Sequence, residues 1–196
     1  MGKLFCLIGP SSSGKDTIYR KIMQARGSVL EKVIPYTTRP IRDEEKDGVQ
    51  YYFTDESGFQ KMKDSGRIIE DREYDSFYGL WRYFTADDGQ IDLKEHSYLI
   101  IATLQSYRKF KEYFESENVI PLYISLDPGI RLQRALDRER NQENPGYEEM
   151  CRRYLADSSD FSAENVKDAG IVRVFDNTEL DHCVNEIVGY IDIFFA

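Results

Sequence analysis

The feature that most constrains the fold is a glycine-rich segment near the start of the chain. Residues 3–8 (KLFCLI) form a short apolar run, and residues 14–25 place Ile18 and Ile22 on one side of a helical pattern. Between them, GPSSSGK at 9–15 fits the spacing G-x-x-x-x-G-K. The sequence therefore predicts a strand, a phosphate-binding loop and a helix in direct succession.

The chemistry of this loop follows from its residue types. Glycines let successive backbone N–H groups converge on phosphate oxygens, and Lys15 adds a positive charge at the helix N-terminus for the β- and γ-phosphates of a nucleotide. The alternative is a Gly/Ser-rich turn that only caps a helix, but strand, spacing, lysine and helix all favour phosphate binding. The expected nucleotide contacts are Gly9, Ser11, Ser12, Ser13, Gly14, Lys15, Asp16 and Thr17.

The loop departs from the usual pattern directly after its lysine. Asp16 stands where a Ser or Thr hydroxyl usually ligates Mg²⁺. Either Asp16 holds the ion, directly or through water, or Thr17 takes over the role. Because a carboxylate also brings negative charge near the phosphates, we favour contact through water and treat Asp16 as the candidate metal residue.

Buried runs recur along the chain at residues 98–103 and 119–126, with a weaker one at 171–175. A plausible helix follows each of them. Strands that alternate with helices predict an α/β fold in which helices cover both faces of a parallel sheet.

Two segments interrupt this alternation. Residues 35–95 are turn-rich and aromatic, with alternating stretches at 49–53 and 68–74, and we interpret them as an insertion into a core formed by residues 1–34 and 96–196. The chain is thus expected to be one domain with an inserted subdomain.

The second interruption is the highly charged stretch 131–160. Apolar residues at helical spacing on either side of residues 144–146, such as Leu132 and Met150, predict two helices joined by a turn. Residues 179–195 are expected to form a closing helix.

Composition excludes several classes of protein. A net charge of −9 and a pI near 4.9 argue against a general nucleic-acid binder, and no apolar run approaches the roughly 20 residues that cross a bilayer. The N-terminus lacks the features of a secretory signal, and three scattered cysteines suggest neither disulfides nor a metal cluster. We therefore expect a cytoplasmic protein with reduced cysteines and surface-exposed His96 and His182.

A second phosphate site is predicted in the segment YTTRPIRDEEKDGVQYYF at 36–53. Arg39 and Arg42 lie three residues apart beside a proline, and Tyr51 follows. Two guanidiniums and a phenol can converge on one phosphate monoester, because the planar fork of arginine binds phosphate oxygens in pairs. Solvated surface arginines are the alternative.

The chain resembles guanylate kinases. The phosphate loop, the TTRP…R…DG…Y segment, the E…YG segment and an arginine-bearing lid follow one another in the family order. The resemblance covers nearly all of the chain and implies a P-loop kinase fold, an acceptor-binding subdomain at about 35–95 and a lid at about 138–153. It also implies phosphoryl transfer from ATP, with Mg²⁺, to GMP as a step of purine nucleotide metabolism.

The resemblance assigns roles to individual residues. Arg39, Arg42, Tyr51 and Tyr78 match the clamp on the acceptor phosphate, and Glu70 matches the carboxylate that accepts hydrogen bonds from guanine N1 and N2. On the ATP side, Arg153 and either Arg138 or Arg140 match the lid arginines of the family. Asn177 matches a residue near adenine. The resemblance implies that Lys15, Arg39, Arg138 and Arg153 stabilise the transferring phosphoryl group.

Other positions allow different interpretations. Acidic neighbours could make the lid arginines part of an ion-paired surface helix, and Asn177 could instead begin the last helix as a turn or cap residue.

Some positions depart from the family pattern. Pro35 and Leu80 replace two polar residues that contact guanine, while Thr103 and Ile101 stand where the family carries acids at a strand end. Thr103 is retained as an acceptor-site residue. We hypothesise that the missing acid has moved across the site to Asp16.

Two alternative functions remain open from the sequence. A GKD phosphate loop also resembles that of ribose 1,5-bisphosphate kinases, so the acceptor could be a phosphorylated ribose. A guanylate kinase-like binding module without catalysis is the other alternative, although both phosphate sites oppose it.

Overall fold

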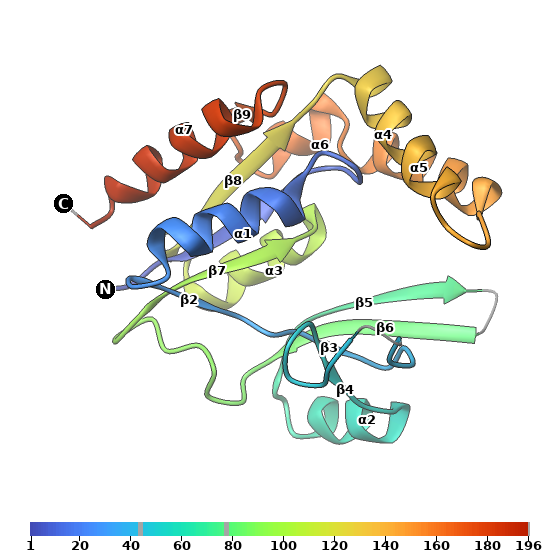
Figure 1. Ribbon diagram of the computed structural model, residues 1–196. Helices are drawn as coiled ribbons and strands as arrows, with labels where there is room; N and C mark the ends of the chain where they lie inside the picture. The colour runs from blue at the N-terminus through green and yellow to red at the C-terminus, as the bar shows by residue number, and fades with distance from the viewer. Residues whose placement is uncertain (43–44, 77–78, 196) are drawn as a thin grey trace.

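A computed structural model describes residues 1–42, 45–76 and 79–195. The chain forms a five-stranded parallel sheet with helices on both faces and a separate four-stranded sheet, which lies below the first in Figure 1. This arrangement confirms the predicted α/β fold.

The five-stranded sheet has the order β2-β7-β1-β8-β9, and all of its pairings are parallel. Its strands are β1 (Leu4–Ile8), β2 (Leu30–Lys32), β7 (Ser97–Ala102), β8 (Val119–Ser125) and β9 (Val174–Asp176). The central strand β1 is completely buried because helices cover the sheet on both sides.

Side chains of β1 alternate between two hydrophobic cores. Leu4, Cys6 and Ile8 face α3 (Leu104–Phe114) and α6 (Ala163–Asp168), and a short 3₁₀ helix, η1 (Ser116–Asn118), follows α3. The other core, which contains Phe5 and Leu7, is closed by α1 (Lys15–Arg26) and α7 (Leu180–Asp192). Both cores hold the sheet rigid beneath the loops at its edge.

The last strand begins later than the sequence pattern predicts. The prediction was residues 171–175, but β9 pairs with β8 only from Val174. Residues 172–174 are all exposed between buried Ile171 and Phe175, so this stretch does not show the alternating burial of a strand.

The four-stranded sheet has the order β4-β3-β6-β5. It comprises β3 (Tyr36–Thr37), β4 (Tyr52–Phe53), β5 (Ile68–Ser76) and β6 (Gly79–Ala86), with α2 (Glu56–Asp64) packed against it. Phe59, Phe84 and Ala86 form a small core of its own. All of these elements fall within residues 35–95, the turn-rich and aromatic segment that the sequence analysis interprets as an insertion.

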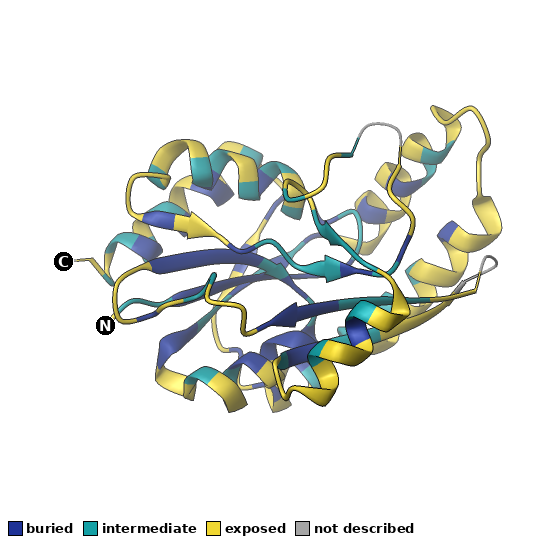
Figure 2. Cartoon of the chain, turned by 90° about the horizontal axis from the view of Figure 1, so that it is seen from below, coloured by how far each residue is buried: buried dark blue, intermediate teal, exposed yellow. Residues whose placement is uncertain are grey.

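Two helices, α4 (Pro128–Arg140) and α5 (Tyr147–Asp160), follow β8 and pack against each other. They match the predicted helix pair, and Figure 2 shows them at the right with mostly exposed residues. The buried residues of α4 are Arg131 and Ala135, whereas Leu132 is 40% exposed. No helix among the described residues is long and apolar enough to cross a membrane.

Candidate active site

The candidate site lies at the carboxyl ends of the parallel strands. The glycine-rich loop follows β1, Thr103 follows β7, the helix pair α4–α5 follows β8, and Asn177 follows β9. Because the strands are parallel, these four connections meet at one edge of the sheet, where α/β proteins bind their ligands.

The backbone of the loop requires glycine at two positions. Gly14 has φ 95°, and a Cβ there would lie 2.3 Å from the side-chain nitrogen of Asn177. At Gly9, a Cβ would lie 2.6 Å from the carbonyl oxygen of Ile124. Strand and helix therefore bring the loop backbone closer to its neighbours than any side chain would permit.

Lys15 folds back over this loop. Its Nζ donates hydrogen bonds to the carbonyl oxygens of Gly9 at 2.7 Å and Pro10 at 2.9 Å. Burial lowers the pKa of Lys15 to about 8, and the carboxylates of Asp157 and Asp16 act in the opposite direction. The charge of Lys15 is thus held at the start of α1, where the helix dipole also favours an anion.

Asn177 holds the loop in place through a buried hydrogen bond to its backbone. It is 1% exposed, and its Nδ2 donates a 2.7 Å hydrogen bond to the carbonyl oxygen of Ser13. The interpretation of Asn177 as the cap of the last helix is wrong, since the N-cap residue of α7 is Glu179. A contact between Asn177 and adenine stays a prediction.

A cavity of about 220 Å³ opens beside the loop. Its lining residues are Ser12, Gly14, Lys15, Asp16, Thr17, Arg134 and Arg138. Arg138 lines this cavity. Nη1 of Arg140 instead lies 3.6 Å from Oδ1 of Asp137, in an ion pair on the surface. The structure therefore favours Arg138 as the arginine that faces the loop.

Arg134 was missed by the sequence analysis. It stands four residues before Arg138 on α4, and this spacing places both on one helix face. The four-residue spacing of these two arginines is visible in the sequence, but the many other charged residues of the segment offer similar spacings.

Helix α5 reaches the loop through two side chains. Nη2 of Arg153 lies 3.4 Å from the hydroxyl oxygen of Ser11, and Oδ2 of Asp157 accepts a 2.7 Å hydrogen bond from the backbone N–H of Ser11. Asp157 was also missed, although it lies one helical turn after Arg153. A carboxylate thus occupies one of the backbone donors that the motif offers to phosphate.

Arg39, which lies two residues after β3, is 4% exposed and forms an ion pair. Its Nη1 and Nη2 donate to the two carboxylate oxygens of Glu45, each at 2.7 Å, and its Cζ lies 5.3 Å from the centre of the Tyr51 ring. The hydrogen bonds from Arg39 hold the pKa of Glu45 below its usual value. Glu45 was not predicted from the sequence.

The other predicted phosphate clamps lie around this pair to different extents. Arg42 is exposed, and its backbone N–H donates to Glu45 Oε2 at 2.9 Å. Burial raises the pKa of Tyr51, so its phenol stays protonated and can donate a hydrogen bond. Tyr78 lies outside the described residues.

Glu70 is buried at 3% exposure and has polar partners on both oxygens. Thr85 Oγ1 donates to Oε1 at 2.9 Å, and Ser106 Oγ donates to Oε2 at 2.8 Å. Thr103 joins this group through a 2.9 Å contact with Ser106 Oγ, and its side chain also caps α3. The structure therefore brings Glu70 and Thr103 together, as predicted members of one site, through Ser106.

Two of the positions that depart from the family pattern, Pro35 and Leu80, carry apolar side chains. Leu80 is 47% exposed on β6, and Pro35 contributes its carbonyl oxygen to the backbone N–H of Tyr52 at 2.9 Å. Neither side chain carries a polar atom that could contact a base.

The oxygen atoms near the loop suit Mg²⁺. Asp16 and Thr17 both line the cavity beside Lys15, and carboxylate and hydroxyl oxygens are hard ligands of the kind that this ion prefers. Within the described ranges, no group of three or more His, Cys, Asp or Glu residues is arranged to hold a metal. The ion would accordingly depend on phosphate oxygens and water for its remaining ligands.

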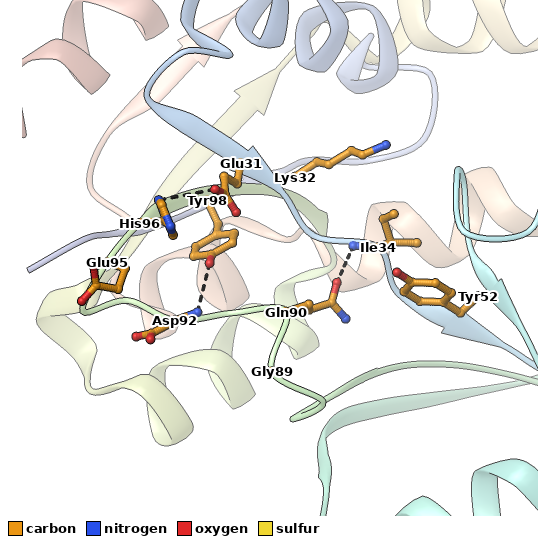
Figure 3. A pocket seen from close by; sticks show the side chains of 10 residues that line it. All are labelled: Glu31, Lys32, Ile34, Tyr52, Gly89, Gln90, Asp92, Glu95, His96 and Tyr98. Atoms are coloured by element: carbon orange, nitrogen blue, oxygen red, sulfur yellow. Dashed lines mark hydrogen bonds and ion pairs between the residues drawn. The ribbon is translucent and has the colours of Figure 1, made fainter.

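A larger cavity of about 480 Å³ lies elsewhere, between β2 and the segment that precedes β7 (Figure 3). Gln90 Oε1 accepts from Ile34 N–H at 2.8 Å, and the Tyr98 hydroxyl accepts from Asp92 N–H at 3.0 Å. These bonds fasten the connection between the two sheets. The cavity shares no lining residue with the loop cavity.

Comparison with known proteins identifies the family. The family model for guanylate kinase matches residues 1–145, about three quarters of the chain. The chain belongs to the guanylate kinase family. A guanylate kinase of Paraburkholderia xenovorans is 30% identical over 162 residues, which cover 82% of this chain and 68% of the relative. The human guanylate kinase is 27% identical over 184 residues, covering 92% and 88% respectively.

The fold agrees with a solved structure of this family. The crystal structure of guanylate kinase from Anaplasma phagocytophilum matches with a TM-score of 0.64 at 24% identity, covering 98% of this chain and 85% of that one. The family model ends at residue 145, so Arg134 and Arg138 fall inside the matched segment, whereas Arg153, Asp157 and Asn177 follow it.

Proposed function

We propose that this protein transfers the γ-phosphoryl group of ATP, bound with Mg²⁺, to GMP, giving ADP and GDP. Membership of the guanylate kinase family supports this function. The observation that carries it is the presence of two separate cationic sites. Lys15 begins α1, directly after the loop that follows β1 of the five-stranded sheet, and Arg39 follows β3 of the four-stranded sheet. Phosphoryl transfer between two phosphorylated substrates requires such a pair.

At the donor site, the loop and the lid have separate tasks. Backbone N–H groups of the loop and the charge of Lys15 bind the β- and γ-phosphates. Arg134, Arg138 and Arg153 come from α4 and α5 and add positive charge around the phosphoryl group as it moves. Such transfer needs little covalent work from the protein, so holding and charge compensation account for most of the catalysis.

At the acceptor site, Arg39 changes partner. Its two-pronged ion pair with Glu45 has the geometry that a phosphate monoester would take. The phosphate of GMP replaces the Glu45 carboxylate on Arg39, with Arg42, Tyr51 and Tyr78 completing the clamp. Glu70 selects the base by accepting hydrogen bonds from N1 and N2 of guanine, and Thr103 supports it through Ser106.

Mg²⁺ would be held by Asp16, directly or through water, with Thr17 as the neighbouring hydroxyl. When bound, the ion offsets the negative charge of the ATP phosphates. Ile101 and Thr103 supply no carboxylate at the end of β7, and we assign the role of the missing acid to Asp16, which lines the loop cavity. Residues 35–95 form the acceptor subdomain in this proposal, and about 138–153 form the moving part of the lid.

The test is an acceptor panel in a coupled assay that reports ADP. GMP, dGMP, AMP, UMP and ribose 1,5-bisphosphate are compared with ATP as donor, with and without Mg²⁺. We expect GMP to give the highest kcat/KM and Mg²⁺ to be required. Preferred turnover of ribose 1,5-bisphosphate would overturn GMP as the acceptor, and no turnover of any acceptor would favour a binding module.

A further inference from the structure

An arginine that the proposed function leaves unassigned lies beside Glu70. Arg72 follows Glu70 by two positions on β5, so both side chains project from the same face of the strand. Nε of Arg72 lies 3.1 Å from Glu70 Oε2, and Nη2 lies 3.5 Å from Oε1. The Arg72 side chain is 16% exposed and that of Glu70 is 2% exposed.

The lone pairs of Glu70 are fully engaged in this arrangement. A carboxylate offers about four acceptor sites, two on each oxygen. Thr85 and Ser106 occupy one on each oxygen, and the guanidinium of Arg72 occupies the others. The two N–H donors of guanine therefore find no free acceptor on Glu70 unless one existing partner moves.

Arg72 is the partner that can leave most readily. Its contacts of 3.1 and 3.5 Å are longer than the 2.9 and 2.8 Å bonds from Thr85 and Ser106. Thr85 and Ser106 are buried at 0% and 1% exposure, whereas Arg72 retains access to solvent. Thr85 and Ser106 consequently fix the carboxylate from the inner side, and Arg72 covers its open side.

Arg72 also lies close to Tyr51, one of the residues proposed to bind the acceptor phosphate. The positive charge of Arg72 acts on the phenol of Tyr51 and tends to lower its pKa, against the larger rise caused by burial. Tyr51 in turn packs against Arg39. The Arg72 side chain thus lies near both the residue proposed to read the base and a residue proposed to bind the phosphate.

We propose that Arg72 is a second specificity-determining residue, which donates a hydrogen bond to O6 of a 6-oxopurine while Glu70 accepts from N1 and N2. This inference rests on the proposed function. It accounts for the release of Arg72, because the O6 oxygen is an acceptor next to the N1–H that takes its place on Glu70. Adenine carries an amino donor at this position, which would face the guanidinium donor without a partner.

Replacing Arg72 should affect recognition of the O6 position, whereas replacing Glu70 should affect recognition of the 2-amino group. GMP and IMP share O6, whereas AMP lacks it. Replacing Arg72 by Met should lower kcat/KM for GMP and IMP together by about 10- to 100-fold, the range for a hydrogen bond to a charged group, and leave AMP nearly unchanged. Glu70→Gln should change the GMP to IMP ratio instead, because only GMP carries the 2-amino group.

The experiment measures kcat/KM for GMP, IMP and AMP in wild type, R72M, R72K and E70Q, with nucleotide titration as a second readout. Arg67→Met is the matched control, since Arg67 precedes β5 on the same subdomain and its side chain contacts Ser65 at 3.0 Å. If R72M does not fold, R72K, which keeps the charge beside Glu70, should still lower the GMP to AMP ratio.

Equal losses for GMP, IMP and AMP in the Arg72 variants would overturn the inference, because they would assign Arg72 to the phosphate or to structural support. An unchanged GMP to AMP ratio would overturn it as well. Failure of the wild type to use GMP would instead contradict the proposed function, so the two failures can be told apart.

Discussion

The donor site and the acceptor site both hold an internal carboxylate where a phosphate is expected, but they are built differently. At the loop, Asp157 from α5 accepts from the backbone N–H of Ser11. At the acceptor site, Glu45 is held by both prongs of the Arg39 side chain. The first site uses a backbone donor in the loop after β1, and the second uses side chains from the segment between β3 and β4, two strands of two residues each.

Because one site uses a backbone N–H group and the other a buried guanidinium, each is stabilised in a different way when no ligand is present. A backbone N–H group cannot turn away, so the single carboxylate of Asp157 on α5 is enough to satisfy that of Ser11. A buried guanidinium such as Arg39 needs a full counter-charge, because an unpaired buried charge is costly. We therefore expect the substrate to displace an acid held by one backbone hydrogen bond at the first site and an acid held by both prongs of Arg39 at the second.

The largest expected effect is a loss of kcat when Lys15, the cation of the donor site, is replaced. Lys15→Ala removes the charge that faces the transferring phosphoryl group and should lower kcat by about 10³-fold, a typical loss for one electrostatic stabiliser. Lys21→Ala, on the same helix but paired with exposed Asp181 at 2.9 Å, is the control. Steady-state kinetics measure both, and a Lys15 variant of near wild-type kcat would contradict the assigned role.

The acceptor half is tested by Arg39→Ala. This change removes the fork that binds the acceptor phosphate and leaves Glu45 without its main partner, so kcat/KM for GMP should fall by about 10²-fold. KM for ATP should stay within about threefold, because the donor site is separate. A similar loss for both substrates, measured alongside the Arg67→Ala control, would argue that Arg39 supports the fold instead.

The pH dependence sharpens the contrast, because only the donor site has a cation that titrates near neutrality. Burial lowers the pKa of Lys15 to about 8, so its charge is present below pH 8 and is lost as the pH rises through that value. In the free enzyme, kcat/KM for ATP should fall by about tenfold per pH unit above pH 8. Binding of GMP to Arg39 should show no such decline, and a flat ATP profile up to pH 10 would contradict the account.

The smallest effect concerns the carboxylate on the loop. Asp157→Asn keeps the shape but removes the negative charge that competes with phosphate, so the affinity for ATP should rise by about three- to tenfold. Isothermal titration with ATP measures this directly. Asp160→Asn on the exposed end of the same helix is the control, and weaker binding of ATP to the Asp157 variant would show that this carboxylate assists the nucleotide.

The sequence predicts the donor loop well because its information is local. Apolar run, glycines, lysine and helix lie within residues 3–25, and the parallel sheet follows from the same alternation repeated along the chain. The contacts that complete the site are not local. Asp157 and Asn177 join the loop from more than 140 residues away, as donors and acceptors that no spacing rule reveals.

The acceptor site shows the same limit in its ion pairs. Arg39 and Glu70 stand out in the sequence as charged residues in a conspicuous segment, but their partners Glu45 and Arg72 look like ordinary members of charged runs. Which charges pair depends on how the short strands bring them together. Leu132 on α4 illustrates the converse, since it is an apolar residue at helical spacing and is nevertheless 40% exposed.

The most direct test of the account is the binding of a bisubstrate analogue, adenosine and guanosine joined by a pentaphosphate chain. If the loop and Arg39 form two ends of one transfer site, this compound should bind at least about 10²-fold more tightly than ATP or GMP alone, by the gain from linking two ligands. Both Lys15→Ala and Arg39→Ala should weaken it. An affinity no greater than that of ATP, or one insensitive to Arg39→Ala, would contradict a site that holds both phosphates in line.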